Sequence, residues 1–206
     1  MNLLIKKIKQ VQSTHIEKQI EVRLIEFRKI GRNKNKIFSE LCFCLLTANF
    51  QAEKSWNIQK EIEDMFFDAN LEDLRIELKA RGHRFWPQRA ERIILARESR
   101  DELIELIKTK NESNIRNWLV KNIKGVGMKE SSHFLRNIGF RGVAIIDFHI
   151  VDLLVAEGLI EKPKTITPKI YLEIEDVLKN LAKKSNMNLG ELDLYLWYIE
   201  TGKVLK

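Results

Sequence analysis

Cysteine is scarce in this sequence, and its scarcity excludes one class of metal site. The two cysteines, Cys42 and Cys44, lie in the apolar run Leu41–Leu46. A four-cysteine zinc site or iron–sulfur cluster cannot be built from two thiols. Residues two apart on a helix point to different faces, so we do not expect this pair to form a disulfide. The sequence instead predicts buried, inert thiols in a reducing compartment.

Long apolar runs are also missing. The longest falls far short of the roughly 20 residues that span a bilayer. Residues 1–9 include Lys6, Lys7 and Lys9 and lack the apolar core and cleavage site of a signal peptide. We therefore expect a soluble protein of the cytoplasm that has no contact with a membrane.

Strand-like alternation is a third absence. No stretch alternates with period two, whereas apolar residues recur at spacings of three and four along the chain. The three prolines fall at helix starts or in loops, as at Pro168, before which Thr167 is expected to cap a helix. Residues 141–146 are β-branched and should form an extended connection, and Gly202 should end the last helix. The predicted fold class is all-α.

Positive charge is in excess. Lysine and arginine number 36 against 29 acidic residues, which gives a net charge of +7. This excess favours an anionic partner such as nucleic acid and speeds the encounter with it. Dense surface ion pairs, as in proteins from hot environments, would explain the same composition. Charge alone therefore leaves both interpretations open.

The most informative segment is Ile123–Glu130, which reads IKGVGMKE. One helical pattern runs into Gly125 and Gly127, and a second begins at once. Two glycines around an apolar residue allow a tight hairpin that a Cβ would obstruct, with Val126 tucked between the helices. Backbone N–H groups of the hairpin then face outward, where a phosphate can accept them. Any glycine-containing turn between helices fits Gly-x-Gly alone, but the residues downstream of the turn favour a helix–hairpin–helix at about 113–139.

An aspartate comes after the hairpin, at the end of a short apolar run. Asp147 lies eighteen residues after Lys129, directly after Ala144-Ile145-Ile146 and before Phe148 and His149. This order resembles the helix–hairpin–helix DNA glycosylase superfamily, in which an apolar segment and an aspartate follow the hairpin. Lys129 stands where the bifunctional members carry a nucleophilic lysine, which the monofunctional members lack. A solvated lysine in the first turn of a helix is the alternative.

Five further runs match one branch of that superfamily. They are LLTAN (45–49), GHRF (82–85), KESSHFLRN (129–137), LDLYLWY (192–198) and TGKVLK (201–206). Through these runs the chain resembles the 8-oxoguanine DNA glycosylases of the short archaeal and bacterial type, over nearly its whole length from about residue 38. The sequence departs from the pattern at Phe148, where the resemblance predicts an arginine. That change can remove a backbone contact or ion pair but leaves the catalytic pair intact.

The resemblance implies a catalytic pair, Lys129 and Asp147. The lysine attacks C1′ of the damaged nucleotide, expels the base and forms a Schiff base, from which β-elimination cuts the strand on the 3′ side. The attacking amine must be neutral, whereas a free lysine has a pKa near 10.4. A helix N-terminus, partial burial and nearby cations favour the neutral form. Asp147 is expected to stabilise positive charge at the sugar and to orient or deprotonate the lysine, and it can also cap the next helix.

The resemblance also implies a base pocket, because the nucleotide must leave the duplex before C1′ can be reached. Trp197 is expected to stack on the base, with Asp193 one helical turn earlier as a hydrogen-bond partner and Phe85 on the other side. Lys206 is implicated in distinguishing 8-oxoguanine from guanine, which lacks the N7–H of the oxidised base. Core packing of Trp197 and a frayed tail at Lys206 are the alternatives.

Several residues are candidates for contacts with the DNA backbone or the helix gap. Asn49 is expected to fill the gap left by the flipped nucleotide, and the hairpin glycines to hold a phosphate. The basic candidates, each of which could equally be surface charge, are Arg84, Arg89, Arg92, Lys124 and His149.

The resemblance implies an architecture of two helical subdomains that flank a cleft. By the same resemblance, one covers about 34–142, and the other joins 1–33 to 143–206 with its C-terminal base-recognition helix. The predicted function is excision of 8-oxoguanine from double-stranded DNA and strand cleavage, by a monomer without cofactor or metal, in the cytoplasm at the nucleoid. An endonuclease III-like enzyme for oxidised pyrimidines stays open, although the missing four-cysteine cluster counts against it. A non-catalytic helix–hairpin–helix protein is the third possibility.

Overall fold

The computed structural model describes residues 2–206, with the backbone alone at Asn2. Every regular element in this range is an α-helix, so the all-α prediction is confirmed. No helix among these residues is long and apolar enough to cross a lipid bilayer.

Contacts between residues divide the chain into two compact units. The hairpin unit is Ile30–Phe134, and the terminal unit joins Met1–Lys29 to Leu135–Lys206. The boundaries therefore lie at 29/30 and 134/135, whereas the sequence suggested 33/34 and 142/143. The second boundary falls inside one helix, α10 (Met128–Asn137).

Residues just after the second boundary belong to the terminal unit because they pack on its second helix. The Arg136 guanidinium lies over the Phe27 ring, 4.9 Å from the ring centroid. Gly139, with φ +96°, lies so close to the backbone of Arg28 that a Cβ would meet its Cα at 3.1 Å. A tight backbone approach of this kind requires glycine.

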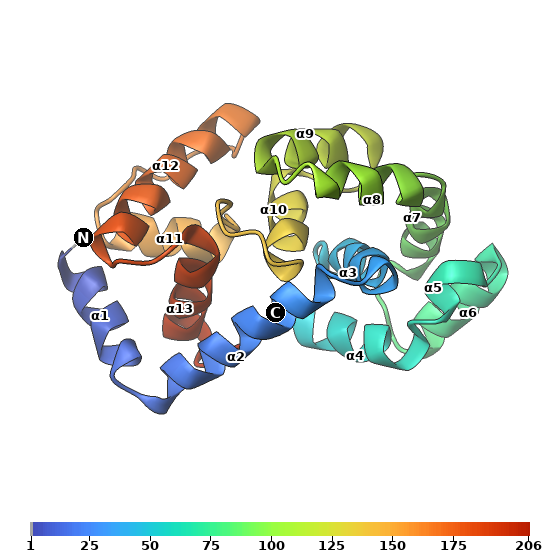
Figure 1. The fold of residues 1–206 in the computed structure, drawn as a ribbon, viewed down its shortest axis with the longest axis horizontal. Helices are drawn as coiled ribbons and strands as arrows, with labels where there is room; N and C mark the ends of the chain where they lie inside the picture. Colours follow the sequence, from blue (N-terminus) through green and yellow to red (C-terminus); the bar gives the residue numbers. More distant parts are fainter. Residues whose placement is uncertain (1) are drawn as a thin grey trace. The chain divides into compact units, whose positions relative to one another are not determined.

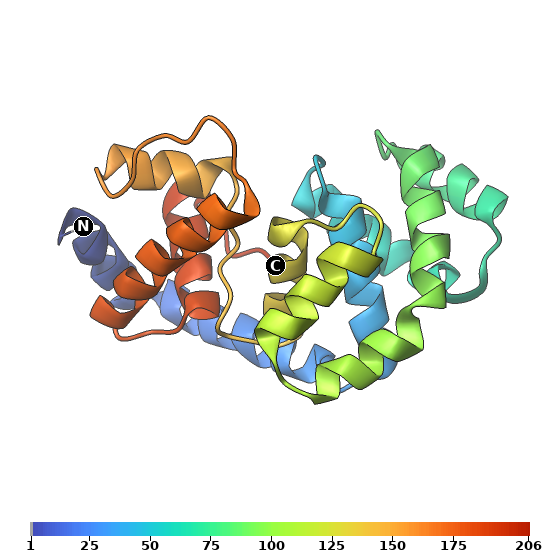
Figure 2. The same cartoon turned by 90° about the horizontal axis from the view of Figure 1, so that it is seen from above.

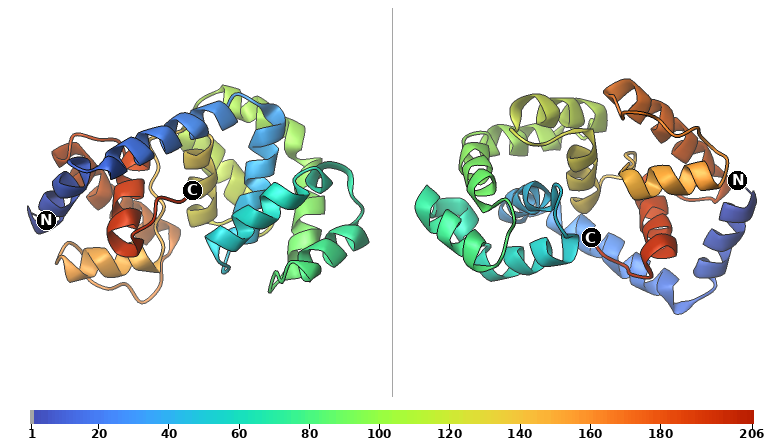
Figure 3. Two further views of the ribbon diagram at one scale, coloured as in Figure 1. Left: turned by 90° about the horizontal axis from the view of Figure 1, so that it is seen from below. Right: turned by 180° about the vertical axis from the view of Figure 1, so that it is seen from behind.

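Helix α3 forms the centre of the hairpin unit (Figures 1 and 3). Its side chains are buried continuously from Ile37 to Thr47, and it packs against α4, α7 and α8. The thiols of Cys42 and Cys44 are free and buried, as predicted, and burial raises the pKa of Cys42. The helices of this unit up to the hairpin are α3 (Lys34–Thr47), α4 (Ala52–Ile62), α5 (Met65–Asp68), α6 (Leu71–Ala80), α7 (Trp86–Glu98), α8 (Arg100–Lys108) and α9 (Glu112–Asn122).

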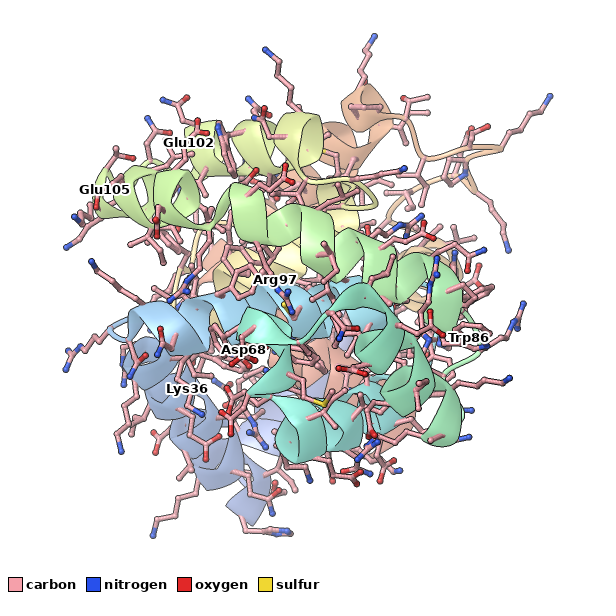
Figure 4. All side chains as sticks on the ribbon, turned by 90° about the vertical axis from the view of Figure 1, so that its right-hand side faces the viewer. Lys36, Asp68, Trp86, Arg97, Glu102 and Glu105 are labelled. Carbon is pink, nitrogen blue, oxygen red and sulfur yellow. The ribbon has the colours of Figure 1, made fainter. Side chains whose placement is uncertain are left out.

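One arginine on α7 hydrogen-bonds the backbone carbonyls of the short helix α5 and of the residue after it (Figure 4). Arg97 donates from Nη2 to the carbonyl of Met65 at 2.8 Å, from Nε to that of Phe66 at 2.8 Å, and from Nη1 to that of Ala69 at 2.7 Å. A helix end leaves its last carbonyls without partners. Arg97 supplies those partners and thereby ties α5 to α7.

Helix α13 forms the centre of the terminal unit, in contact with α1, α11 and α12 (Figures 1 and 2). Two predicted helix ends are confirmed there: Thr167 caps α12 by accepting from the N–H of Ile170, and Gly202 (φ +69°) ends α13. The helices of this unit are α1 (Asn2–Gln12), α2 (His15–Ile30), α11 (Phe148–Ala156), α12 (Pro168–Lys184) and α13 (Leu189–Thr201).

Candidate active site

The segment between α9 and α10 is the predicted hairpin. Helix α9 ends at Asn122, and the carbonyl of its C-cap residue Ile123 accepts the N–H of Val126 at 3.1 Å. The Val126 side chain is buried, as predicted, whereas Lys124 and Gly125 are exposed. The apolar residue thus holds the hairpin against the helices and leaves the two residues before it open to solvent.

Gly125 is required by both its backbone angle and its surroundings. Its φ is +89°, and a Cβ there would lie 2.6 Å from the guanidinium of Arg92 on α7. Arg92 was predicted to contact phosphate, and the structure places its positive charge directly against the hairpin. This position suits an anion held at the hairpin, but the contact itself stays a prediction.

Gly127 is a glycine for a different reason. It has no positive φ, and a Cβ there would approach Oε2 of Glu130 to 3.3 Å. That oxygen accepts the N–H of Gly127 at 3.2 Å, which is one half of a capping box at the start of α10. No role was predicted for Glu130. Its position three residues after Gly127, the residue before α10, is nevertheless the spacing of a capping box.

Lys129 lies at the second position of α10, with 31% of its side chain exposed. Its Nζ is 3.7 Å from Oε1 of Glu130, so one carboxylate serves both the hairpin backbone and the lysine. Two serines stabilise the start of α10. Ser131 Oγ donates to the carbonyl of Gly127 at 2.8 Å, and Ser132 Oγ donates to the carbonyl of Met128 at 2.8 Å. Lys129 is therefore half-exposed on a rigidly held turn.

Asp147 is the N-cap of α11 in the terminal unit. Its Oδ1 accepts the N–H of Ile150 at 3.0 Å, which confirms the capping role that the sequence allowed. Within the terminal unit its second oxygen, Oδ2, has no hydrogen-bond donor. A carboxylate with one oxygen fixed and one available can both end a helix and act on a substrate.

The extended connection before Asp147 is held by α12. Tyr171 donates its hydroxyl to the carbonyl of Ala144 at 2.7 Å and accepts the N–H of Ile146 at 3.2 Å. Glu175 accepts the N–H of Ala144 at 3.0 Å. These bonds satisfy backbone groups that lack a strand partner. The extended form predicted for 141–146 is confirmed, whereas the two side chains that hold it were not foreseen.

Asp193 on α13 is paired with Arg136, at 3.4 Å between Oδ2 and Nη2. Both side chains are almost buried, at 11% and 5% exposed. Burial raises the pKa of Asp193 to about 6, the positive charge of Arg136 opposes that rise, and the carboxylate of Asp147 adds to it. The structure thus places Asp147 close enough to Asp193 for its charge to affect the pKa of Asp193.

Three aromatic rings lie together beside Asp147. The rings of Phe148 and His149 are 3.9 Å apart between centroids, and His149 meets Trp197 edge-on at 5.7 Å. Trp197 is only half-buried, so it is not a simple core residue. The structure therefore brings four of the predicted site residues together in the terminal unit: Asp147, His149, Asp193 and Trp197.

His83 ties Phe85 to the last turn of α3, three residues before Asn49. Its Nε2–H donates to the carbonyl of Leu46 at 3.0 Å, and its Nδ1 accepts the N–H of Phe85 at 3.2 Å. Both bonds fit a neutral ring, and burial lowers the pKa of His83. Asn49 is exposed with φ +58°, a conformation that asparagine tolerates better than most residues.

The two basic candidates next to Phe85 have different surroundings. Arg84 is exposed, with its guanidinium 4.7 Å from the Phe85 ring centroid, and stays a candidate for a phosphate contact. Arg89 is only 4% exposed and donates to the carbonyl of Ala48. The prediction that Arg89 contacts phosphate is therefore wrong, because its side chain is buried and its guanidinium is bonded to the C-cap residue of α3.

Lys206 lies four residues after Gly202 and is only 7% exposed. The alternative of a frayed tail is therefore wrong. Its proposed role in base discrimination stays a prediction. Among residues 2–206, no group of three or more His, Cys, Asp or Glu side chains is placed to hold a metal ion.

Known proteins match this chain from end to end. A family model described as 8-oxoguanine DNA glycosylase matches residues 20–187. A protein of Methanocaldococcus jannaschii named 8-oxoguanine DNA glycosylase/AP lyase is 48% identical, over 99% of this chain and 100% of that protein. A crystal structure of the M. jannaschii glycosylase/lyase, in complex with a 15mer DNA containing 8-oxoguanine, has a TM-score of 0.95 at 47% identity and covers 99% and 100% of the two chains. The 8-oxoguanine DNA glycosylase of Thermotoga maritima gives 0.94 at 39% identity, with 100% and 99% covered.

Proposed function

The chain belongs to the 8-oxoguanine DNA glycosylase family, and on this premise we propose that it is a bifunctional DNA repair enzyme. It excises 8-oxoguanine from double-stranded DNA and then cleaves the strand as an abasic-site lyase. The observation that carries the proposal is the full-length match to a relative named for both activities. The two alternatives, an enzyme for oxidised pyrimidines and a non-catalytic DNA-binding protein, have no comparable support.

Lys129 is the proposed nucleophile. Its side chain is 31% exposed, at the second position of α10 directly after the hairpin. The lone pair of the amine forms a bond to C1′ as the bond from C1′ to the base breaks, and that electron pair leaves with the base. The nitrogen then loses a proton, and its lone pair forms the C=N bond as the C1′–O4′ bond breaks and O4′ takes up a proton, which opens the sugar ring. The resulting Schiff base acidifies the C2′ hydrogen, and loss of that proton expels the 3′ phosphate. Covalent catalysis thus divides one difficult step into easier ones.

Asp147 is the proposed electrostatic partner of this reaction. Positive charge develops at the sugar as the base leaves, and a fixed carboxylate stabilises that charge without having to reorganise. The cap to Ile150 fixes one oxygen of Asp147, and the bonds from Tyr171 hold the chain that leads to it. Its Oδ2 is the oxygen available to the sugar or to the lysine.

The remaining predicted residues are proposed to bind DNA and the flipped base. The exposed hairpin residues Lys124 and Gly125, with Gly127, would hold a phosphate. Asn49 would occupy the gap in the duplex, with Arg84 on the backbone. The base pocket would be formed by Phe85, His149, Asp193, Trp197 and Lys206. Asp193 can serve it through Oδ1, because Oδ2 is the oxygen that pairs with Arg136.

The working form is proposed to be a monomer in the cytoplasm, at the nucleoid where its DNA substrate lies. The net charge of +7 supports binding to a polyanion. No cofactor is required by the proposed chemistry, because the protein supplies both the nucleophile and the carboxylate.

Covalent trapping tests the proposed function. The protein is incubated with a duplex that carries 8-oxoguanine opposite cytosine, and borohydride is added to reduce any Schiff base to a stable adduct. We expect an adduct with the wild type and with Lys121→Gln, a matched change at an exposed lysine in the last turn of α9, and none with Lys129→Gln. Trapping only with a thymine-glycol duplex would favour the pyrimidine enzyme. An absence of trapping with any lesion would favour the non-catalytic protein.

A further inference from the structure

Phe148 is the most exposed large apolar side chain among the described residues, at 66%. It is the first residue of α11, directly between the capping Asp147 and His149. Leaving a phenylalanine in water forgoes the free energy of burying it. A single exposed apolar residue is nevertheless ordinary, so the exposure of Phe148 alone does not indicate a function. The contacts of its ring are the evidence for one.

The ring is held outward by its neighbours. Consecutive residues on a helix do not normally face each other, yet the Phe148 and His149 rings approach to 3.9 Å at an interplanar angle of 36°. His149 in turn rests edge-on against Trp197, at 5.7 Å and 86°. Phe148 is thus the outer member of a three-ring array and is fixed from behind rather than free to fold onto the protein surface.

Polar groups around the array also lack partners within the terminal unit. The indole N–H of Trp197 is buried there without an acceptor. The backbone N–H groups of Phe148 and His149 begin α11 and have no acceptor in the helix, because Asp147 caps the N–H of Ile150 instead. An anionic group beside the exposed ring would meet these two N–H groups.

We propose that the Phe148 ring is a stacking contact for an unpaired nucleobase of the bound DNA. The inference rests on the proposed function, because taking a nucleotide out of a duplex leaves bases without their stacking partners. Aromatic side chains accept any base by its π-face, without reading sequence. The contact is apolar, so salt does not weaken it as it weakens contacts to phosphate.

Fluorescence of 2-aminopurine tests the stacking directly. Duplexes carry an uncleavable tetrahydrofuran abasic analogue, with 2-aminopurine on its 5′ side, on its 3′ side or opposite it. We expect the wild type to quench the probe at one of these positions. Phe148→Leu, which keeps the apolar side chain but removes the ring, should lose that quenching, and Phe148→Trp should keep it. Phe140→Leu, the same change at a half-buried ring of the same unit, is the matched control.

Binding measured over a range of salt concentrations gives a second readout. Phe148→Leu should weaken binding to the abasic duplex about tenfold, because stacking on one base is worth about 1–3 kcal/mol. The slope of log K against log salt should stay that of the wild type. Phe148→Arg, which adds one cation, should steepen it by about 0.9. Phe148 is exposed, so all variants should melt within about 2 °C of the wild type.

The stacking proposal is overturned if Phe148→Leu quenches 2-aminopurine like the wild type at every position. It is also overturned if the loss of affinity appears as a change in salt slope, which would indicate a disturbed phosphate contact. Borohydride trapping with 8-oxoguanine DNA separates these failures from failure of the proposed function. A wild type that traps lesion DNA, with a Phe148→Leu variant that stacks normally, would refute the stacking contact alone.

Discussion

The hairpin that presents Lys129 and the cap that presents Asp147 are built in opposite ways. Around Lys129 the determining contacts come from within a few residues: Glu130 accepts the N–H of Gly127 and lies 3.7 Å from the lysine. Around Asp147 a local cap to Ile150 is joined by contacts from far along the chain, from Tyr171 on the extended segment and from Asp193 near the carboxylate. The nucleophile is therefore placed by local geometry, whereas its proposed partner also depends on tertiary contacts.

The two regions also differ in how they handle charge. Lys129 and Glu130 are partly exposed, so solvent screens their attraction and the pair is weak. Asp193 and Arg136 are almost fully buried, and burial dominates the pKa of Asp193. We therefore expect the effects of pH on the native state to arise near Asp147 more than at the hairpin.

Asp147→Asn should have the largest effect and tests whether the cap does more than end a helix. Asparagine caps a helix as well as aspartate does, so α11 and DNA binding should persist. Release of 8-oxoguanine should nevertheless fall at least 100-fold, on the order of the loss seen when a preorganised electrostatic group is removed. Single-turnover base excision and binding to an abasic-analogue duplex are the measurements.

The matched control for that change is Asp152→Asn, which removes an exposed carboxylate from the same helix. It should excise at the wild-type rate. If DNA binding by Asp147→Asn fell as much as excision, Asp147 would be a structural residue. The cap of α11 would then have no role in the reaction, in contrast to the hairpin that carries Lys129.

Asp193 gives the second largest effect, on stability. Its pKa is raised from 3.8 to about 6 in the folded protein, so between these values the native state binds more protons than the unfolded chain. The stability from this group is complete below pH 3.8 and is lost as pH rises through 6. The rise in the pKa from 3.8 to about 6 corresponds to a loss of up to about 3 kcal/mol.

The Asp193→Asn variant has no titratable group at this position, so its stability does not change with pH through residue 193. In urea unfolding from pH 4 to pH 7, the wild type should therefore lose up to about 3 kcal/mol relative to the variant. Lys129→Gln, the matched change at the hairpin, should follow the wild type over the same range. Parallel curves for the wild type and Asp193→Asn would show that the Arg136 pair offsets burial completely, and would remove the electrostatic contrast between the two regions.

Deleting Lys206 should have the smallest effect and separates recognition from chemistry. We expect the ratio of excision of 8-oxoguanine over guanine to fall about tenfold, because a lost hydrogen bond that reads the base is worth about 1–2 kcal/mol. Trapping on a preformed abasic site should change little, since no base is present. Lys203→Ala is the control at an exposed neighbour. Equal losses in both assays would assign Lys206 to folding or general binding.

The same contrast explains what the sequence could predict. The hairpin, the cap at Asp147, the cap at Thr167 and the end at Gly202 all depend on residues within about four positions, and all are confirmed. The all-α class follows from apolar spacing, which is also local. Glu130 could have been found in the same way, from the spacing of a capping box.

Long-range contacts could not be read in this way. Nothing near Asp193 in the sequence indicates that Arg136 will pair with it, fifty-seven positions away. Arg89 resembles its exposed neighbours in the basic helix, yet the fold buries it against the end of α3. Tyr171 and Glu175 lie on what reads as an ordinary amphipathic helix. Each case depends on which face of a helix packs against a distant segment. The spacing of apolar residues predicts the buried face of a helix but not the segment that packs against it.

The fit of Arg92 against Gly125 has a consequence for how this family can diverge. The guanidinium occupies the space that a Cβ at position 125 would need. A larger residue at 125 would displace the positive charge from the hairpin and would also have to adopt an unfavourable φ. The effect of a substitution at 125 should therefore depend on which residue stands at 92, so that the two positions are epistatic.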